Sequence, residues 1–336
     1  MASAKEFKQL FIIPFMDLLL LCLVILSFLL SLVFVRLTIN YHMNCGIADV
    51  NYARKDDKKI ALAGGIGLVI PLWISSLIAI YFFGFIFEIV SIALLVTVFA
   101  LIGYIDDRNP KFLKKSLGWK VRALPMAVAA LIFAGVFSFN PLFLWIIPLA
   151  LFVAGFASLI NTFEGLNCWG VGTGTIILIF ISIYFFVAAS PMLFYALILT
   201  AISFGLVIFN KYPAKTLPGD SGTLFIGSSI VGVTLASADV RLIILVILFF
   251  IPALIDFFVL KIISNPKDIS QSKSRPYKIL GDGRLTIPDG KATIDFAKLL
   301  MKKFGPMHEG EVVALIWLIV VINCSFWFLL FTLFIF

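Results

Sequence analysis

Charged side chains are scarce in this sequence. Asp, Glu, Lys and Arg make up 13% of the 336 residues, whereas hydrophobic residues make up 62%. An ordinary soluble domain carries roughly 25% charged residues. So little polar surface cannot coat a water-soluble globule, and the mean hydropathy of +1.13 agrees. The composition therefore excludes a soluble globular fold and predicts an integral membrane protein that is surrounded by a lipid bilayer.

Cysteine and histidine are also scarce. The four cysteines are scattered without a CxxC pair, and there are only two histidines. A disulfide framework and a zinc site are therefore not expected. The formal net charge of +8 is assigned mainly to contacts with anionic lipid headgroups, and nucleic acid is not expected as a partner.

Long apolar runs dominate the chain. A helix needs about 20 apolar residues to cross the bilayer core. The runs predict ten transmembrane helices, at 14–37, 60–82, 86–105, 121–138, 141–161, 173–189, 191–209, 221–237, 240–263 and 311–335. The expected fold class is an all-α polytopic membrane protein that forms a single transmembrane domain over 1–336.

Basic residues are distributed unevenly over the predicted loops. The loops that follow odd-numbered helices share one side. Their basic residues are Arg54, Lys55, Lys58, Lys59, Arg108, Lys111, Lys114, Lys115, Lys120, Lys211 and Lys215, with nine more between 264 and 310. The other side holds only Lys5, Lys8 and Arg241. By the positive-inside rule the basic side is cytoplasmic, so both termini are expected outside.

The longest polar segment, 264–310, is predicted to be a cytoplasmic loop inserted between the ninth and tenth helices. Asp282-Gly283 between short apolar stretches is typical of a hairpin turn. Residues 291–304 alternate apolar and basic positions, which favours a short amphipathic helix.

Acidic and amide side chains gather at helix ends on the same side. Asp106 and Asp107 directly follow one apolar run, and Asp220 directly precedes another. The other members are Asp49, Asn51, Asn161, Glu164 and Asn167. Carboxylates at a membrane edge are costly without a cation, and Mg²⁺ binds oxygen ligands together with substrate phosphates. The pattern therefore predicts a site for Mg²⁺ and phosphate, with helix capping and headgroup contacts as the alternative.

Two further features add candidates for phosphate binding. Asp220 lies in a Gly-Asp-Ser-Gly-Thr stretch that opens a helix, where glycines and free N–H groups favour anions. The alternative is that Asp220 is a simple N-cap. Lys120, Arg275 and Lys278 are candidates to clamp a diphosphate, whereas headgroup contacts explain most other basic residues.

Several strings stand in a fixed order along nearly the whole chain: Gly46-Ile-Ala-Asp-Val-Asn51, Gly103-Tyr-Ile-Asp-Asp107, Asn161-Thr-Phe-Glu-Gly-Leu-Asn167, Asn210-Lys-Tyr-Pro-Ala-Lys215 and Gly219-Asp220-Ser-Gly. In these strings the sequence resembles the polyprenyl-phosphate N-acetylhexosamine-1-phosphate transferase family. The last loop departs from the histidine-rich motif of bacterial members. Its Ser-Arg275-Pro-Tyr-Lys278-Ile is closer to the eukaryotic branch and closer still to archaeal relatives.

The resemblance implies transfer of N-acetylhexosamine-1-phosphate, above all GlcNAc-1-phosphate, from the UDP-sugar to a polyprenyl or dolichyl phosphate. It implies Mg²⁺, or Mn²⁺, held by Asp220 and Asn161, with Asp106, Asp107 and Lys120 as catalytic residues. The substrate-binding residues that it implies are Asp49, Asn51, Glu164, Asn167, Asn210, Arg275 and Lys278. The expected location is the plasma membrane of a prokaryote, an archaeon in particular, with the endoplasmic reticulum as second choice. Whether the chain forms a homodimer stays open.

An ion-coupled secondary transporter is the main rival class. Transporters usually carry polar residues near the bilayer midplane, on broken helices in two similar halves. In this sequence the acids gather at one boundary and the halves do not match, which favours an enzyme.

Overall fold

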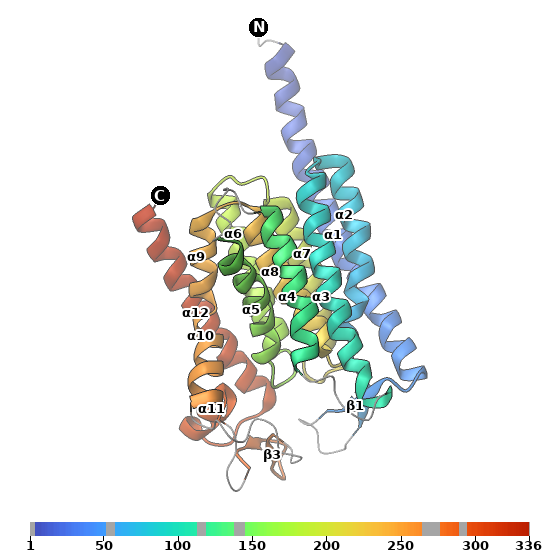
Figure 1. Cartoon of the computed structure of the whole chain (residues 1–336), viewed down its shortest axis with the longest axis vertical. Helices are drawn as coiled ribbons and strands as arrows, with labels where there is room; N and C mark the ends of the chain where they lie inside the picture. Colours follow the sequence, from blue (N-terminus) through green and yellow to red (C-terminus); the bar gives the residue numbers. More distant parts are fainter. Residues whose placement is uncertain are drawn as a thin grey trace.

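A computed structural model of the chain describes residues 4–51, 58–112, 119–137, 145–263, 276–288 and 294–335. Across these residues the protein is an all-α bundle with two small hairpins at one end (Figure 1). The helices are α1 (Ala4–Asn44), η1 (Gly64–Leu68), α2 (Val69–Phe83), α3 (Ile86–Phe112), α4 (Trp119–Phe137), α5 (Ile146–Thr162), α6 (Trp169–Val187), α7 (Leu193–Asn210), α8 (Gly219–Ala236), α9 (Val240–Phe249), α10 (Ile251–Leu254), η3 (Ile255–Ile263), α11 (Phe296–Phe304) and α12 (Glu309–Ile335).

Within these described ranges, a helix lies in each of the ten predicted intervals. Six spans are long and apolar enough to cross a bilayer: Asp17–Asn44, Gly64–Phe83, Ile86–Arg108, Trp169–Val187, Leu193–Asn210 and Glu309–Leu333. A seventh is the pair Val240–Phe249 and Ile251–Ile262, which is bent by 52°. The apolar parts of α4 and α5 are shorter, so ten crossings remain a prediction while the all-α membrane fold is confirmed.

The outward faces of the helices are apolar. Leu77, Ile132 and Phe186 are 62%, 65% and 72% exposed and come from α2, α4 and α6. A soluble monomer rarely exposes large contiguous apolar patches, whereas a bilayer solvates such side chains. The outside of the bundle is therefore suited to lipid.

Several helix ends differ from the sequence-based expectation. The predicted helix at 60–82 begins instead with strand β2 (Lys59–Ala61), because Ala61 O accepts the N–H of Leu217 and the hydroxyl of Thr216. The chain then turns through η1 before α2 begins. Helix α3 is longer than predicted and runs to Phe112. Asp106 and Asp107 therefore lie within a helix rather than after one.

The predicted helix at 240–263 is a broken segment of α9, α10 and the π-helix η3. Proline cannot donate a backbone hydrogen bond and bends a helix, and Pro252 lies in the first turn of α10. Inside η3, Asp256 pairs with Lys261 at 2.7 Å and accepts the backbone N–H of Phe296 at 2.8 Å. These contacts neutralise the buried carboxylate and tie η3 to α11.

Hairpins and loops collect at one end of the bundle. β1 (Ala48–Val50) pairs antiparallel with β2, and β3 (Lys278–Ile279) pairs antiparallel with β4 (Leu285–Thr286). Gly283, at φ +87°, forms the predicted turn between β3 and β4. Figure 1 shows the N-terminal end of α1 and the C-terminal end of α12 at the opposite end of the bundle. An even number of crossings would place both termini on one side in this way.

Helix α8 lies inside the bundle and packs against α3, α5 and α6. All of its residues from Ser221 to Ala236 are buried, and many are Gly, Ser or Thr. Small residues allow transmembrane helices to approach closely. A Cβ built on Gly103 of α3 would lie 2.5 Å from the backbone of Asp220 and Ser221. The end of α3 is thus held directly against the start of α8.

This close approach predicts that Gly103→Ala separates α3 from α8. Overpacking a tight helix contact costs about 1–3 kcal/mol of folding free energy. Gly135→Ala in α4 is the matched control, because a Cβ there meets nothing within 4 Å, and the change should be neutral or slightly stabilising. Thermal unfolding of both variants in detergent measures the difference, and equal melting temperatures would contradict the close contact.

Candidate active site

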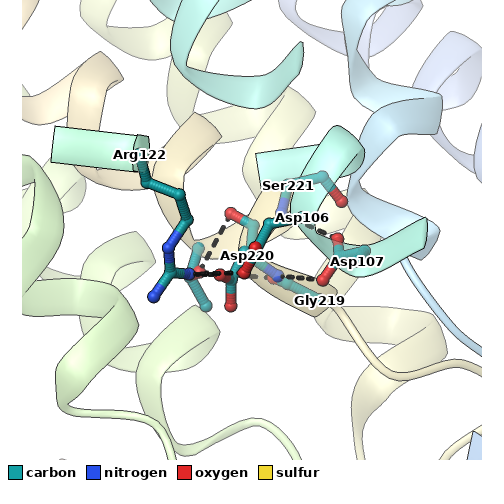
Figure 2. Close-up of polar contacts among 7 residues, drawn as sticks. Asp106, Asp107, Arg122, Gly219, Asp220 and Ser221 are labelled. Atoms are coloured by element: carbon teal, nitrogen blue, oxygen red, sulfur yellow. Dashed lines mark hydrogen bonds and ion pairs between the residues drawn. The ribbon is translucent and has the colours of Figure 1, made fainter. Parts of the chain in front are cut away.

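Asp107 binds the N-terminus of α8. Its Oδ1 accepts the backbone N–H of Asp220 at 2.8 Å, and its Oδ2 accepts that of Ser221 at 3.1 Å (Figure 2). Free N–H groups at a helix start carry a partial positive charge, so a carboxylate there is stabilised. Helix capping, the alternative weighed for these acids, therefore describes Asp107, and Asp220 is not the N-cap of α8.

Asp220 faces a cation instead. Arg122 in the first turn of α4 extends one guanidinium nitrogen to Asp106 at 2.7 Å, and the same nitrogen contacts Asp220 (Figure 2). Asn161, from α5, lines the same cavity as Asp220. Carboxylates from α3 and α8 thus share one arginine, and Arg122 supplies the positive charge that lets them lie together.

A cavity of about 270 Å³ opens beside this cluster. Acidic and amide side chains form most of its polar wall. The lining residues include Asn51, Asp107, Asn161, Glu164, Asn167, Pro218, Gly219, Asp220 and Tyr277. The cavity therefore has a charged side near α3 and α8 and an amide-rich side near the loop between α5 and α6. Such a division suits a ligand with a charged part and a neutral polar part.

Glu164 lies at the N-terminus of α6, in the loop after α5. The backbone N–H groups of Gly170 and Val171 and the charge of Lys261 lie near enough to favour its ionised form. Burial outweighs these contacts and raises the pKa of Glu164 from 4.5 to about 8. Glu164 therefore holds a proton over much of the neutral range.

Asn167 is fixed by two buried neighbours. Its backbone N–H and its side-chain Nδ2 both donate to Glu309 Oε1, at 2.8 and 2.7 Å, and Nδ2 also donates to Asn51 Oδ1 at 3.3 Å. Glu309 is the first residue of α12. This contact joins the amide-rich side of the cavity to the last helix of the chain.

Tyr277 brings the segment before β3 to the cavity. Its ring is buried, and its hydroxyl donates to Asp295 Oδ2 at 3.2 Å. Burial and the neighbouring carboxylate of Asp295 raise the pKa of the Tyr277 hydroxyl, which therefore stays protonated. The tyrosine is a neutral wall of the cavity and a hydrogen-bond donor to the loop.

The structure brings together most of the residues predicted for the site. Those in or directly beside the cavity are Asn51, Asp106, Asp107, Asn161, Glu164, Asn167 and Asp220. Asp49 is exposed in β1 and accepts the N–H of Val50. Lys278 lies in β3 and is absent from the cavity wall. Arg275 and the side chain of Lys120 lie outside the described residues.

Asn210 has a different setting from the one predicted for it. It is fully buried, its Oδ1 accepts the backbone N–H of Cys168 at 2.7 Å, and its Nδ2 donates to Thr216 O at 2.9 Å. Both of its polar groups therefore hold loops together. Asn210 supports the cavity wall from behind rather than lining it.

Sequence reasoning did not single out three residues that the structure brings to the site. Arg122 lies two residues after Lys120 at the start of α4, and no pattern in the sequence indicates that Arg122 faces the acids. Glu309 precedes an apolar run as Asp220 does, so the signal of an acid at the membrane boundary was available for it. No feature of the sequence indicated a role for Tyr277, apart from its position between Arg275 and Lys278.

The fold and the site together define an α-helical membrane protein with a pocket of acidic and amide side chains at one end of its bundle. The sequence pattern of glycosyl transferase family 4 matches residues 89–238, which include most of α3 and all of α4 to α8. A protein of Sulfolobus acidocaldarius is 32% identical over 62% of this chain and 68% of its own length. It carries the provisional name UDP-N-acetylglucosamine–dolichyl-phosphate N-acetylglucosaminephosphotransferase.

A Saccharolobus solfataricus protein with the same name is 29% identical over 80% of this chain and 83% of its own length. The phospho-N-acetylmuramoyl-pentapeptide-transferase of Shouchella clausii is 27% identical over 51% of this chain and 59% of its own length. The chain belongs to glycosyl transferase family 4, which confirms the resemblance found in its motifs. These relatives are named as transferases, and the hypothesis of a transporter has no support among them.

The raised pKa of Glu164 predicts a pH dependence of stability. The folded protein holds the Glu164 proton up to about pH 8, whereas the unfolded chain loses it near 4.5. Between these values the folded state binds more protons, so its stability falls as pH rises. Glu164→Gln removes this loss, and its melting temperature should increasingly exceed that of the wild type across this window.

Glu311→Gln, at an exposed carboxylate of α12, is the control for the loss of one acid. Melting curves of the three proteins in detergent at several pH values measure the effect. Parallel curves for the wild type and Glu164→Gln would contradict the raised pKa.

Proposed function

We propose that the protein transfers N-acetylhexosamine-1-phosphate, most specifically GlcNAc-1-phosphate, from the UDP-sugar to a polyprenyl or dolichyl phosphate and releases UMP. The observation that carries this proposal is the convergence of Asp106, Asp107, Asp220 and Arg122 beside a cavity at one end of a membrane bundle. Family membership sets the reaction class. The sugar and the lipid are taken from the names of the archaeal relatives.

The donor set fits a magnesium ion that keeps substrate oxygens as ligands. In the described part of the chain, no three His, Cys, Asp or Glu side chains form a ready cage for a metal ion. Mg²⁺ is usually bound by one or two carboxylates plus substrate phosphates, so a full cage is not required. Asp106 Oδ1 is buried without a hydrogen-bond partner among these residues, which leaves a carboxylate oxygen available.

Asp220 and Asn161 are the proposed ligands, and Mn²⁺ would accept the same oxygens. When bound, the ion would neutralise the diphosphate of the nucleotide sugar and stabilise the charge of the transition state. Arg122 has a planar guanidinium that suits phosphate oxygens. Since it already contacts Asp106 and Asp220, it is positioned to bind a phosphate that arrives between them.

The reaction needs little proton transfer. An oxygen of the acceptor phosphate forms a bond to the sugar-bearing phosphorus, the bond from that phosphorus to the bridging oxygen breaks, and UMP leaves with the electron pair. A phosphate monoester is mostly ionised at neutral pH, so its oxygen needs positioning more than a base. Both oxygens of Asp107 are engaged by α8, which makes Asp106 the better candidate to position the acceptor.

The site is proposed to face the cytoplasm in a prokaryotic plasma membrane, archaeal by analogy with the relatives named above. This orientation rests on the positive-inside rule. Among the described basic residues, Lys59 in β2 and Lys278 in β3 lie at the hairpin end of the bundle (Figure 1). A water-soluble nucleotide sugar and a lipid phosphate at the interface can meet there. The donor preference is open to direct test with UDP-GlcNAc, UDP-GalNAc and UDP-MurNAc-pentapeptide as alternatives.

Asp220→Asn tests the catalytic assignment. Loss of a carboxylate that holds the ion should lower turnover by roughly 100-fold or more, in line with the removal of one electrostatic stabiliser. Asp239→Asn, at the cap of α9 on the opposite end of the bundle, should keep turnover near that of the wild type. The assay is Mg²⁺-dependent release of UMP from UDP-GlcNAc with a polyprenyl phosphate, and near-normal turnover of Asp220→Asn would remove the assignment.

A labelling experiment tests the orientation. Cys45 is exposed at the site end of α1, whereas Cys168 and Cys324 are buried. In a Cys22→Ser background, Cys45 should react with a membrane-impermeant maleimide only when the cytoplasmic face is accessible. Val240→Cys in a Cys45→Ser background reports the opposite end, where Val240 is exposed. Labelling of Cys45 from outside intact cells would reverse the proposed topology.

A further inference from the structure

The side-chain amide of Asn167 is held in one orientation. A primary amide has two N–H donors and one carbonyl acceptor. Both donors are used, because Nδ2 binds Glu309 Oε1 and Asn51 Oδ1. Within the described ranges, Oδ1 of Asn167 has no hydrogen-bond partner, and Asn167 lines the cavity. The group that Asn167 offers to a ligand is therefore an acceptor.

Glu309 enforces this orientation. When it is ionised, Glu309 only accepts hydrogen bonds, and its Oε1 receives the backbone N–H of Asn167 at 2.8 Å. Turning the amide over would place Oδ1 of Asn167 against the carboxylate oxygens, and two acceptors in a buried site repel each other. Glu309 is buried at the start of α12, so water does not offer a substitute partner.

We infer that Glu309 is a positioning residue that sets the nucleobase specificity of the cavity. By keeping Oδ1 of Asn167 toward the ligand, it selects a base that presents an imide N–H. Uracil has such a donor at N3, whereas N3 of cytosine is itself an acceptor and would face another acceptor. The inference rests on the proposed function, since it takes the ligand of this cavity to be the nucleotide part of the sugar donor.

A purely structural role of Glu309 predicts something different. If Glu309 only tied α12 to the loop after α5, a glutamine would serve as well, since its carbonyl oxygen can accept both N–H groups of Asn167. Glutamine also carries a donor, however, and can stabilise the inverted amide by donating to Oδ1 of Asn167. The inverted amide would offer N–H to the base. The two roles therefore differ in base preference, not only in stability.

The test measures binding of UMP, CMP and N3-methyl-UMP to the purified full chain in lipid nanodiscs by calorimetry, at a pH of about 8, where Glu309 is mostly ionised. The wild type should favour UMP over CMP by roughly 10- to 100-fold, the usual cost of one unpaired buried hydrogen-bonding group. It should also bind N3-methyl-UMP weakly. Glu309→Gln should weaken UMP binding and shrink the UMP-to-CMP ratio by about tenfold.

Two further variants complete the design. Glu309→Asp keeps a group that only accepts and should retain the preference for UMP. Glu311→Gln changes an exposed acid of the same helix that contacts the N–H of His308 rather than the cavity, and should bind as the wild type does. Thermal unfolding of each variant shows whether it is folded.

A folded Glu309→Gln protein with the wild-type UMP-to-CMP ratio would overturn the inference while leaving the proposed function intact. If Glu309→Gln does not fold, the wild type still decides the matter, because equal affinities for UMP and N3-methyl-UMP would overturn the inference. A wild-type protein that binds none of these nucleotides would overturn the proposed function, and the inference with it.

Discussion

The contact between Asp107 and the first N–H groups of α8 determines how the rest of the site is arranged. One carboxylate at the end of α3 satisfies two backbone donors that a buried helix start would otherwise leave without partners. Gly103, one turn earlier, allows the two backbones to approach closely enough for this contact. Because α8 is fixed at this depth, Asp220 lies across from Arg122 and at the rim of the cavity. The chemistry of the site therefore depends on a helix-capping interaction.

The charges around this contact are balanced only in part. Three aspartates lie together, and Arg122 is the cation that contacts two of them. Burying carboxylates is costly without positive partners or hydrogen bonds, and Asp107 uses backbone donors for that purpose. The remaining deficit of positive charge is a physical argument for the proposed divalent ion and its phosphate ligands. It also explains why the acids are confined to the helix ends, where a polar substrate can reach them.

Much of the fold was predictable because lipid exposure imposes a simple constraint on sequence. Long apolar runs gave the helix positions, and Asp282-Gly283 gave the turn between β3 and β4. The helix ends were less predictable, since hydrogen bonds between distant residues set them, as Ala61 with Leu217 illustrates. Within the site, the role of Asn210 was equally hard to predict, because it too depends on contacts between distant residues. Its amide supports two loops from a buried position, whereas a motif reveals only that an amide is present. Arg122 and Lys120 are two positions apart on one helix, and only tertiary packing decides which faces α3.

The two sides of the cavity differ in the kind of group that they are proposed to recognise and in the interaction that would recognise it. In the proposed function, the charges near α3 and α8 act on phosphate groups, and such interactions tolerate some freedom of position because Coulomb forces vary smoothly with distance. Near Asn167, recognition depends on which atom of a neutral amide faces the ligand, and a rotation about one bond would reverse it. That side therefore needs a rigid partner, which the buried carboxylate of Glu309 supplies at the start of α12. The last helix, although far in sequence from the acidic motifs, is thus coupled to what the cavity can bind.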